Sequence, residues 1–193
     1  MEPTSKLWSS DGTYGDAPLE KAIHITAHLT IRDVYIHDGA GGVRGIELAS
    51  GRQQERFPRT SVTATNVTVS HNAGGAFNAG ILDLTDVTAD YNAGGVGGNR
   101  VHGTNVSTSN NTNGGILASQ VGIDGLTAND NGGPGVRAKT VRLKNSLVTG
   151  NTHLGTTMDL MTTKRPRLQD SVCGRSQRIN TVLGRTWRVC TTD

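Results

Sequence analysis

Short stretches of alternating apolar and polar residues recur along the chain from Val62 to Asn151. Each stretch opens with an apolar-x-apolar pair, continues with a turn-forming Asn, Asp or Gly, and then adds a second alternating run. Period-2 alternation interrupted by turn residues predicts pairs of short, half-buried strands. One asparagine follows each pair at a regular interval, and we call these residues the marker asparagines: Asn72, Asn92, Asn111, Asn131 and Asn151.

The marker asparagines are spaced by 20, 19, 20 and 20 residues. A constant period of this length predicts a repeat protein in which each repeat forms one coil of a solenoid. A single coil is too small to have its own core, so it becomes stable only when neighbouring coils stack upon it. Stacked strands lie about 4.8 Å apart. Equivalent residues therefore form columns, in which the marker asparagines can hydrogen-bond along the stack.

This repeat resembles the right-handed parallel β-helix proteins of the pectate-lyase-like superfold. The resemblance covers residues 29–172 and rests on the repeat, because no catalytic motif of a particular subfamily is matched. It implies an all-β, right-handed parallel β-helix of about six coils with a cap at each end. The superfold includes lyases, hydrolases, epimerases and non-catalytic surface proteins, so the fold alone does not select a function.

The pattern divides the chain into three regions. We predict a lead-in segment over residues 1–28, the coils over 29–172, and a C-terminal cap over 173–193. The first coil is longer than the others because residues 51–60 form an inserted charged loop. Such an insertion can be functional, or it can be a tolerated surface loop. Residues 167–172 match residues 142–147 and predict a last, partial coil.

Composition and charge exclude several classes of partner. Aromatic residues make up 4% of the 193 residues, and the net charge of +3 comes from a cluster of cations that begins at Lys164. This cluster either forms a solvated cap or attracts an acidic polymer. Nucleic acid is not expected, because no recognised module or aromatic platform accompanies the charge. No apolar run is long enough to span a membrane, and no signal peptide is predicted in this chain.

Two cysteines, Cys173 and Cys190, lie in the last segment. Neither belongs to a Cys-x-x-Cys pair or stands near a histidine cluster, so a metal site is not predicted there. We predict that they form a disulfide, which favours a secreted or cell-surface protein. We further expect a monomer.

Alternation along the first strand of each coil predicts which side chains point outward. Asp83 should lie beside His102, and Asp124 beside Lys144, because adjacent coils place equivalent residues together. The two outward columns read Thr30, Thr63, Asp83, His102, Gly122, Arg142, Arg167, and Arg32, Thr65, Thr85, Thr104, Asp124, Lys144, Gln169.

These columns contain the candidate site. In parallel β-helix lyases a base removes the proton at C5 of a uronate while a cation stabilises the enolate. By this resemblance the catalytic candidates are His102 and Asp83, and the substrate-binding candidates are Asp124, Arg142, Lys144 and Arg167. No cofactor is predicted. A calcium ion is conceivable but lacks a clear site, because Asp83 and Asp124 lie two coils apart, which is about 9–10 Å. The alternative is an exposed ladder of weak ion pairs.

Three functions remain open at this point. The first is an extracellular module that binds acidic polysaccharide or has a structural role. The second is a polysaccharide lyase, or a related hydrolase or epimerase, acting on uronate polymers. The third is an ice- or surface-binding protein, indicated by outward Thr and Ser in the second strand of each coil, although Thr is also a favoured strand residue.

Overall fold

The computed structural model describes residues 21–25, 28–39, 44–48 and 61–179. This part of the chain contains strands and no helix. The strands are β1 (Lys21–Ile25), β2 (His28–His37), β3 (Arg44–Leu48), β4 (Ser61–Ser70), β5 (Gly75–Thr88), β6 (Gly94–Ser107), β7 (Ile116–Thr127), β8 (Val136–Lys144), β9 (Leu147–Val148), β10 (Thr152–His153), β11 (Thr156–Thr157), β12 (Leu160–Thr162), β13 (Arg167–Gln169), β14 (Val172–Cys173) and β15 (Ser176–Arg178).

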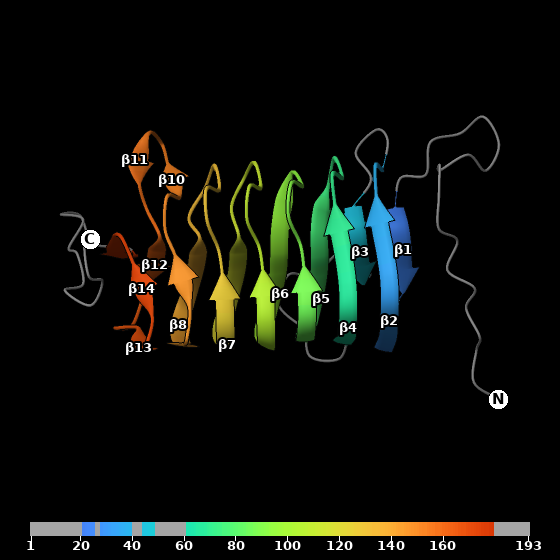
Figure 1. The fold of residues 1–193 in the computed structure, drawn as a ribbon, viewed down its shortest axis with the longest axis horizontal. Helices are drawn as coiled ribbons and strands as arrows, with labels where there is room; N and C mark the ends of the chain where they lie inside the picture. Colours follow the sequence, from blue (N-terminus) through green and yellow to red (C-terminus); the bar gives the residue numbers. More distant parts are fainter. Residues whose placement is uncertain (1–20, 26–27, 40–43, 49–60, 180–193) are drawn as a thin grey trace.

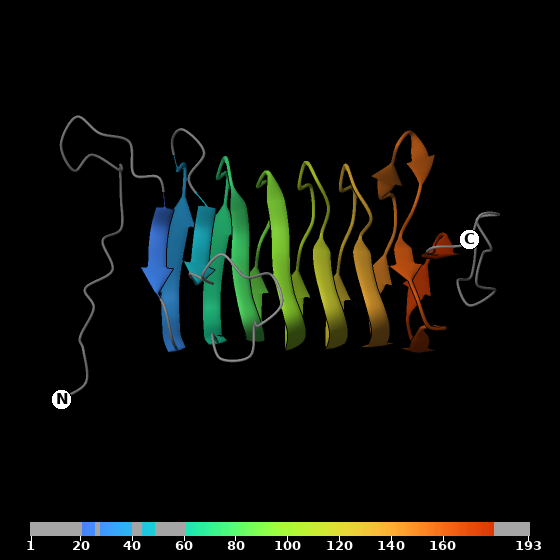
Figure 2. The same cartoon turned by 180° about the vertical axis from the view of Figure 1, so that it is seen from behind.

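The strands stack as a parallel β-solenoid of about six turns, which confirms the predicted all-β fold. Strands β1, β3, β5, β6, β7, β8, β12 and β15 follow one another in hydrogen-bonded order, and β2 pairs with β4, which pairs with β5. Figures 1 and 2 show the coils succeeding one another along one axis, with β1 and β2 at one end and β12 to β15 at the other. Only the hairpin β10–β11 pairs antiparallel among the described strands.

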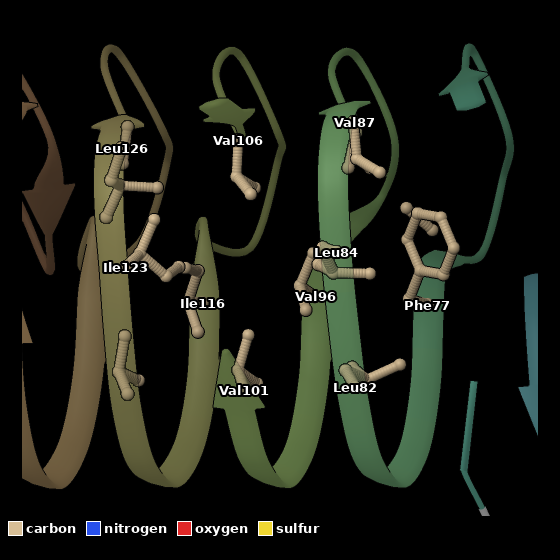
Figure 3. Packing of buried hydrophobic residues seen from close by; sticks show 14 of the residues in the cluster. Phe77, Leu82, Leu84, Val87, Val96, Val101, Val106, Ile116, Ile123 and Leu126 are labelled. Carbon is tan, nitrogen blue, oxygen red and sulfur yellow. The ribbon is translucent and has the colours of Figure 1, made fainter. Parts of the chain in front are cut away.

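Each coil has three faces, which we number in chain order. The first face contains residues 62–65 and their partners 82–85, 101–104, 121–124, 141–144 and 167–169. The second contains residues 67–70 and their equivalents in later coils. The third contains residues 75–79, 94–98, 116–118, 136–138 and 160–162. Strands β5 to β8 curve from the third face into the first face of the next coil, as Figure 3 shows.

Two columns of left-handed residues form the sharp corners. One separates the first face from the second, and its members have φ between 47° and 78°: Asp33, Asn66, Asp86, Asn105, Gly125, Asn145 and Asp170. A left-handed conformation costs an ordinary residue about 1–2 kcal/mol, and Asn, Asp and Gly tolerate it best. The second column immediately precedes the marker asparagines. It includes His71 and Tyr91, whose rings stack with their centroids 5.1 Å apart.

The core consists of inward columns of aliphatic side chains. On the first face Leu82, Val101 and Val121 follow one another in register, and on the third face Phe77, Val96 and Ile116 do the same. Each of these six side chains is at most 4% exposed. Figure 3 shows Leu82, Leu84 and Val87 of one coil pointing into the space that Phe77 also occupies. Equivalent residues stack on each other, so every coil buries its apolar surface against two neighbours.

The marker asparagines form a buried ladder at the turn between the second and third faces. The side-chain oxygen of each accepts a hydrogen bond from the backbone N–H of the preceding one, and the Asn92-to-Asn111 and Asn111-to-Asn131 bonds are both 2.9 Å long. The ladder ends at Asp159, which is fully buried. Its carboxylate accepts bonds from the backbone and amide nitrogens of Asn151 and from the backbone N–H of Arg175. Asp159 therefore takes the place of the next asparagine.

Some predicted features lie partly or wholly outside the described residues. The inserted loop at 51–60 and most of the two predicted end segments are among them. Within the predicted lead-in, β1 pairs in parallel with β3. Cys173 is buried, but Cys190 lies outside the described range, so the Cys173–Cys190 disulfide stays a prediction.

Candidate functional site

The first face carries the two outward columns that the alternation predicts. In the observed register Asp83 pairs with His102, His102 with Gly122, Gly122 with Arg142, and Arg142 with Arg167. The neighbouring column runs through Thr85, Thr104, Asp124, Lys144 and Gln169 in the same way. All six sequence-predicted site residues therefore lie on this face, and five of them are exposed while Asp124 is half-buried.

Asp83 and His102 are neighbours, but no hydrogen bond or ion pair between these two described residues is present. The His102 ring instead lies over Gly122: a Cβ placed on Gly122 would be 3.5 Å from the imidazole Nδ1. Gly122 thus contributes no side chain between His102 and Arg142, and the imidazole occupies part of the space above it. The backbones of His102 and Arg142 lie two coils apart, which is about 9–10 Å.

Asp124 is already engaged within the protein. Its carboxylate accepts a 2.8 Å hydrogen bond from the Asn145 amide and forms a 3.1 Å ion pair with the Lys144 ammonium group. The Asn145 hydrogen bond first, and the Lys144 interaction second, hold the pKa of the Asp124 carboxyl below its ordinary value. Lys144 is therefore paired with a carboxylate, whereas Arg142 and Arg167 form no ion pair within the described part of the chain.

The lowered pKa of Asp124 gives a direct test of this local geometry. We expect the Asp124 carboxyl to titrate below the ordinary range of an aspartate, and Asn145→Ala to raise that pKa because the largest stabilising contact of the ionised form is lost. The shift favours the folded state above the unfolded-state pKa, and this contribution disappears as the pH falls through the folded-state value. Carboxyl chemical shifts followed against pH measure both pKa values. An unchanged pKa in Asn145→Ala would contradict the assignment, with Asn113→Ala as the control.

The second face does not form an uninterrupted hydroxyl array. Its outward positions include Asp90, which accepts hydrogen bonds from the Ser107 hydroxyl and the Ser109 backbone N–H. Leu147 occupies another of these positions and is 41% exposed. A carboxylate and an aliphatic side chain thus break the regular Thr and Ser spacing on which the ice-binding hypothesis depends.

The third face contains a long open groove that the sequence reasoning missed. It has a volume of about 1290 Å³ and extends across several coils, from Ala73 to the hairpin residue His153. Glycines form much of its floor, asparagine side chains line it, and Arg137, Lys139 and His153 stand at its C-terminal end. Figure 2 looks onto this face of the solenoid. The signal in the sequence is the glycine pair that follows most of the marker asparagines, as in Gly74-Gly75 and Gly94-Gly95.

The described residues lack two structural features: a metal-binding side-chain cluster and a membrane-spanning helix. This part of the chain contains no cluster of three or more His, Cys, Asp or Glu side chains that could hold a metal ion. Asp83 and Asp124 belong to different columns and to coils two apart. None of the described segments is a helix long and apolar enough to cross a membrane.

Comparisons of the chain with protein-family models, with curated proteins and with solved structures found no match. The likeness to the pectate-lyase-like superfold is therefore suggested only by the parallel β-solenoid fold.

Proposed function

We propose that this solenoid is an extracellular, non-catalytic module that binds an acidic polysaccharide on its first face. The observation that carries the proposal is the pairing of Arg142 with Arg167 in adjacent coils, both exposed and both without a carboxylate partner in the described chain. Natural exposed sheets usually offset such like-charged neighbours, because like charges directly opposite are destabilising. An anionic ligand would remove this repulsion.

Arginine suits a polysaccharide carboxylate particularly well. The guanidinium is planar and can donate two parallel hydrogen bonds to one carboxylate. Two arginines at the spacing of adjacent coils would hold charged groups in a row along the solenoid axis. Because both side chains are exposed, we expect binding to weaken as the salt concentration rises.

Titration with oligogalacturonate tests the proposal. The double variant Arg142→Ala/Arg167→Ala should bind at least tenfold more weakly than the wild-type protein, because each lost charge-assisted hydrogen bond is worth about 1.5–3 kcal/mol. Arg100→Ala is the matched control: Arg100 is exposed, and its partners in register are Ile81 and Gln120. Equal affinity of the double variant and the wild-type protein, or an affinity that does not respond to salt, would rule out this binding site.

A polysaccharide lyase is the second candidate function, and the position of His102 favours it. The imidazole lies over Gly122, with Arg142 as the next residue of the column. This arrangement could place a base and a cation on either side of a uronate. Incubation with uronate polymers, followed at the absorbance of unsaturated chain ends, tests it. A lyase would lose turnover in His102→Ala and keep binding, whereas a binding module releases no unsaturated ends in either form.

A further inference from the structure

The third-face groove is lined by three columns of residues. Its central column runs through Asn78, Gly97, Leu117 and Arg137, which pair in register from coil to coil. Gly97 leaves this column without a side chain between Asn78 and Leu117. The flanking columns add Gly75, Gly94 and Gly114 on one side and Asn99, Ser119 and Lys139 on the other. The groove is thus open where the glycines lie and has polar side chains along one edge.

The fold does not require glycine at the centre of this floor. A Cβ on Gly97 would meet its nearest neighbours, the Asn78 side chain and the Phe77 carbonyl oxygen, at 3.6 Å, which is ordinary contact, and its φ is not left-handed. Gly94 has similar room. Gly95 is different, because a Cβ there would overlap the backbone carbonyl of Gly115. Glycine inside a strand weakens it and often marks a place where a ligand approaches the backbone. Gly94 and Gly97 fit that explanation, since packing does not account for them.

Charge is distributed unevenly along the groove. Among the residues whose side chains the structure describes, no aspartate or glutamate lines the groove, and the cationic side chains of Arg137 and Lys139 both lie at its C-terminal end. They are two residues apart on β8, so they point to the same side of the strand. His153 reaches the same end from the hairpin β10–β11, which projects beyond the neighbouring turns in Figure 1. No ion pair in the described part of the chain involves any of the three.

The lining residues also match the hydrogen-bonding needs of uncharged sugars. The amides of Asn78, Asn99 and Asn113 each offer both donors and acceptors for hydroxyl groups. None of the three makes a side-chain hydrogen bond to another described residue. Leu117, which is 60% exposed, supplies an apolar surface on the floor.

We propose that the third-face groove is a second binding site, for a linear glycan that runs along the solenoid axis. Uncharged sugars would lie over Gly94 and Gly97, and one anionic sugar would be held by Arg137, Lys139 and His153. The inference relies on the proposed function only for the class of ligand, a carbohydrate. The position of the groove, its lining residues and its charge distribution do not depend on the first face. The first face is proposed to bind a different ligand, one that carries a charge on successive sugar units.

Three probes separate the two sites: neutral xylohexaose, a xylo-oligosaccharide with one glucuronate at its non-reducing end, and fully charged oligogalacturonate. Binding of each is measured by calorimetry. We expect the singly charged probe to bind the groove most tightly. Gly97→Val places a side chain on the floor of the groove, and Arg137→Ala/Lys139→Ala removes the two positive charges at its end. Each variant should bind the singly charged probe at least tenfold more weakly than the wild-type protein. The melting temperature of Gly97→Val should stay the same or rise, because valine favours strands.

The first-face double variant Arg142→Ala/Arg167→Ala is the matched control. This variant should bind the singly charged probe as tightly as the wild-type protein and should bind oligogalacturonate more weakly. Gly97→Val should bind the singly charged probe more weakly and oligogalacturonate as tightly as the wild-type protein. If the singly charged probe does not bind, or binds Gly97→Val as well as the wild type, the groove is not a glycan site. That result leaves the first-face proposal standing. Loss of oligogalacturonate binding in Gly97→Val but not in the first-face variant would instead refute the first-face site.

Discussion

Leu84→Asp is expected to abolish cooperative folding. Leu84 is 1% exposed and lies in an inward column of the first face, where Ala64 and Gly103 are its partners in the adjacent coils. Aspartate at this position would place a carboxylate among aliphatic side chains, with no partner to compensate its lost hydration. Burial of an unpaired charge costs several kcal/mol, whereas a whole domain is stable by about 5–15 kcal/mol.

In a solenoid, the unfolding of one coil also destabilises the coils on either side of it. Each coil is stable only through its contacts with two neighbours, so an unfolded central coil separates the array into two shorter pieces. Circular dichroism during urea titration measures the effect, and the variant should lack the transition of the wild-type protein at 25 °C. Thr85→Asp is the control, because Thr85 is exposed on the same strand; it should change stability by less than about 1 kcal/mol. A normal transition in Leu84→Asp would contradict the observed register.

Asn111→Ala should destabilise the protein by about 2–6 kcal/mol, since two buried groups lose their partners at about 1–3 kcal/mol each. Asn111 is 1% exposed and lies at the middle of the asparagine ladder. Its side-chain oxygen accepts from the Asn92 backbone N–H, and its amide donates to the Ala89 carbonyl oxygen; both bonds are 2.9 Å long. Alanine cannot replace either bond, and water does not reach the site.

The free energy of unfolding from urea titration measures the loss. Asn113→Ala provides the matched comparison, because Asn113 is exposed two residues further along the same turn. This substitution should change the free energy of unfolding by less than about 0.5 kcal/mol. Equal stability of the two variants would show that the ladder contributes little beyond filling space. We expect instead that the ladder holds successive turns in register.

The fold and its register follow from the amino-acid sequence. Residues such as Asp83 and His102 fall in equivalent places of a 20-residue repeat, and parallel stacking has one pairing that keeps every aliphatic side chain inward. The left-handed corners at Asn66 and Asp86 are marked by residue types that tolerate positive φ. Strand alternation and repeat spacing are local properties of the chain, and they suffice to predict that the six candidate residues share the first face.

The contacts of these residues, and the formation of the third-face groove, depend instead on tertiary packing. Asp124 takes Asn145 and Lys144 as partners, and the His102 ring lies over Gly122, because side-chain directions depend on the neighbouring coil. The third-face groove arises only when glycines of different coils stack, so no single repeat contains it. Asp159 completes the asparagine ladder although it stands eight residues after Asn151 rather than a full repeat. A buried hydrogen bond forms between groups that are close in space. Where the repeat ends, the repeat interval no longer predicts which residue lies next to Asn151.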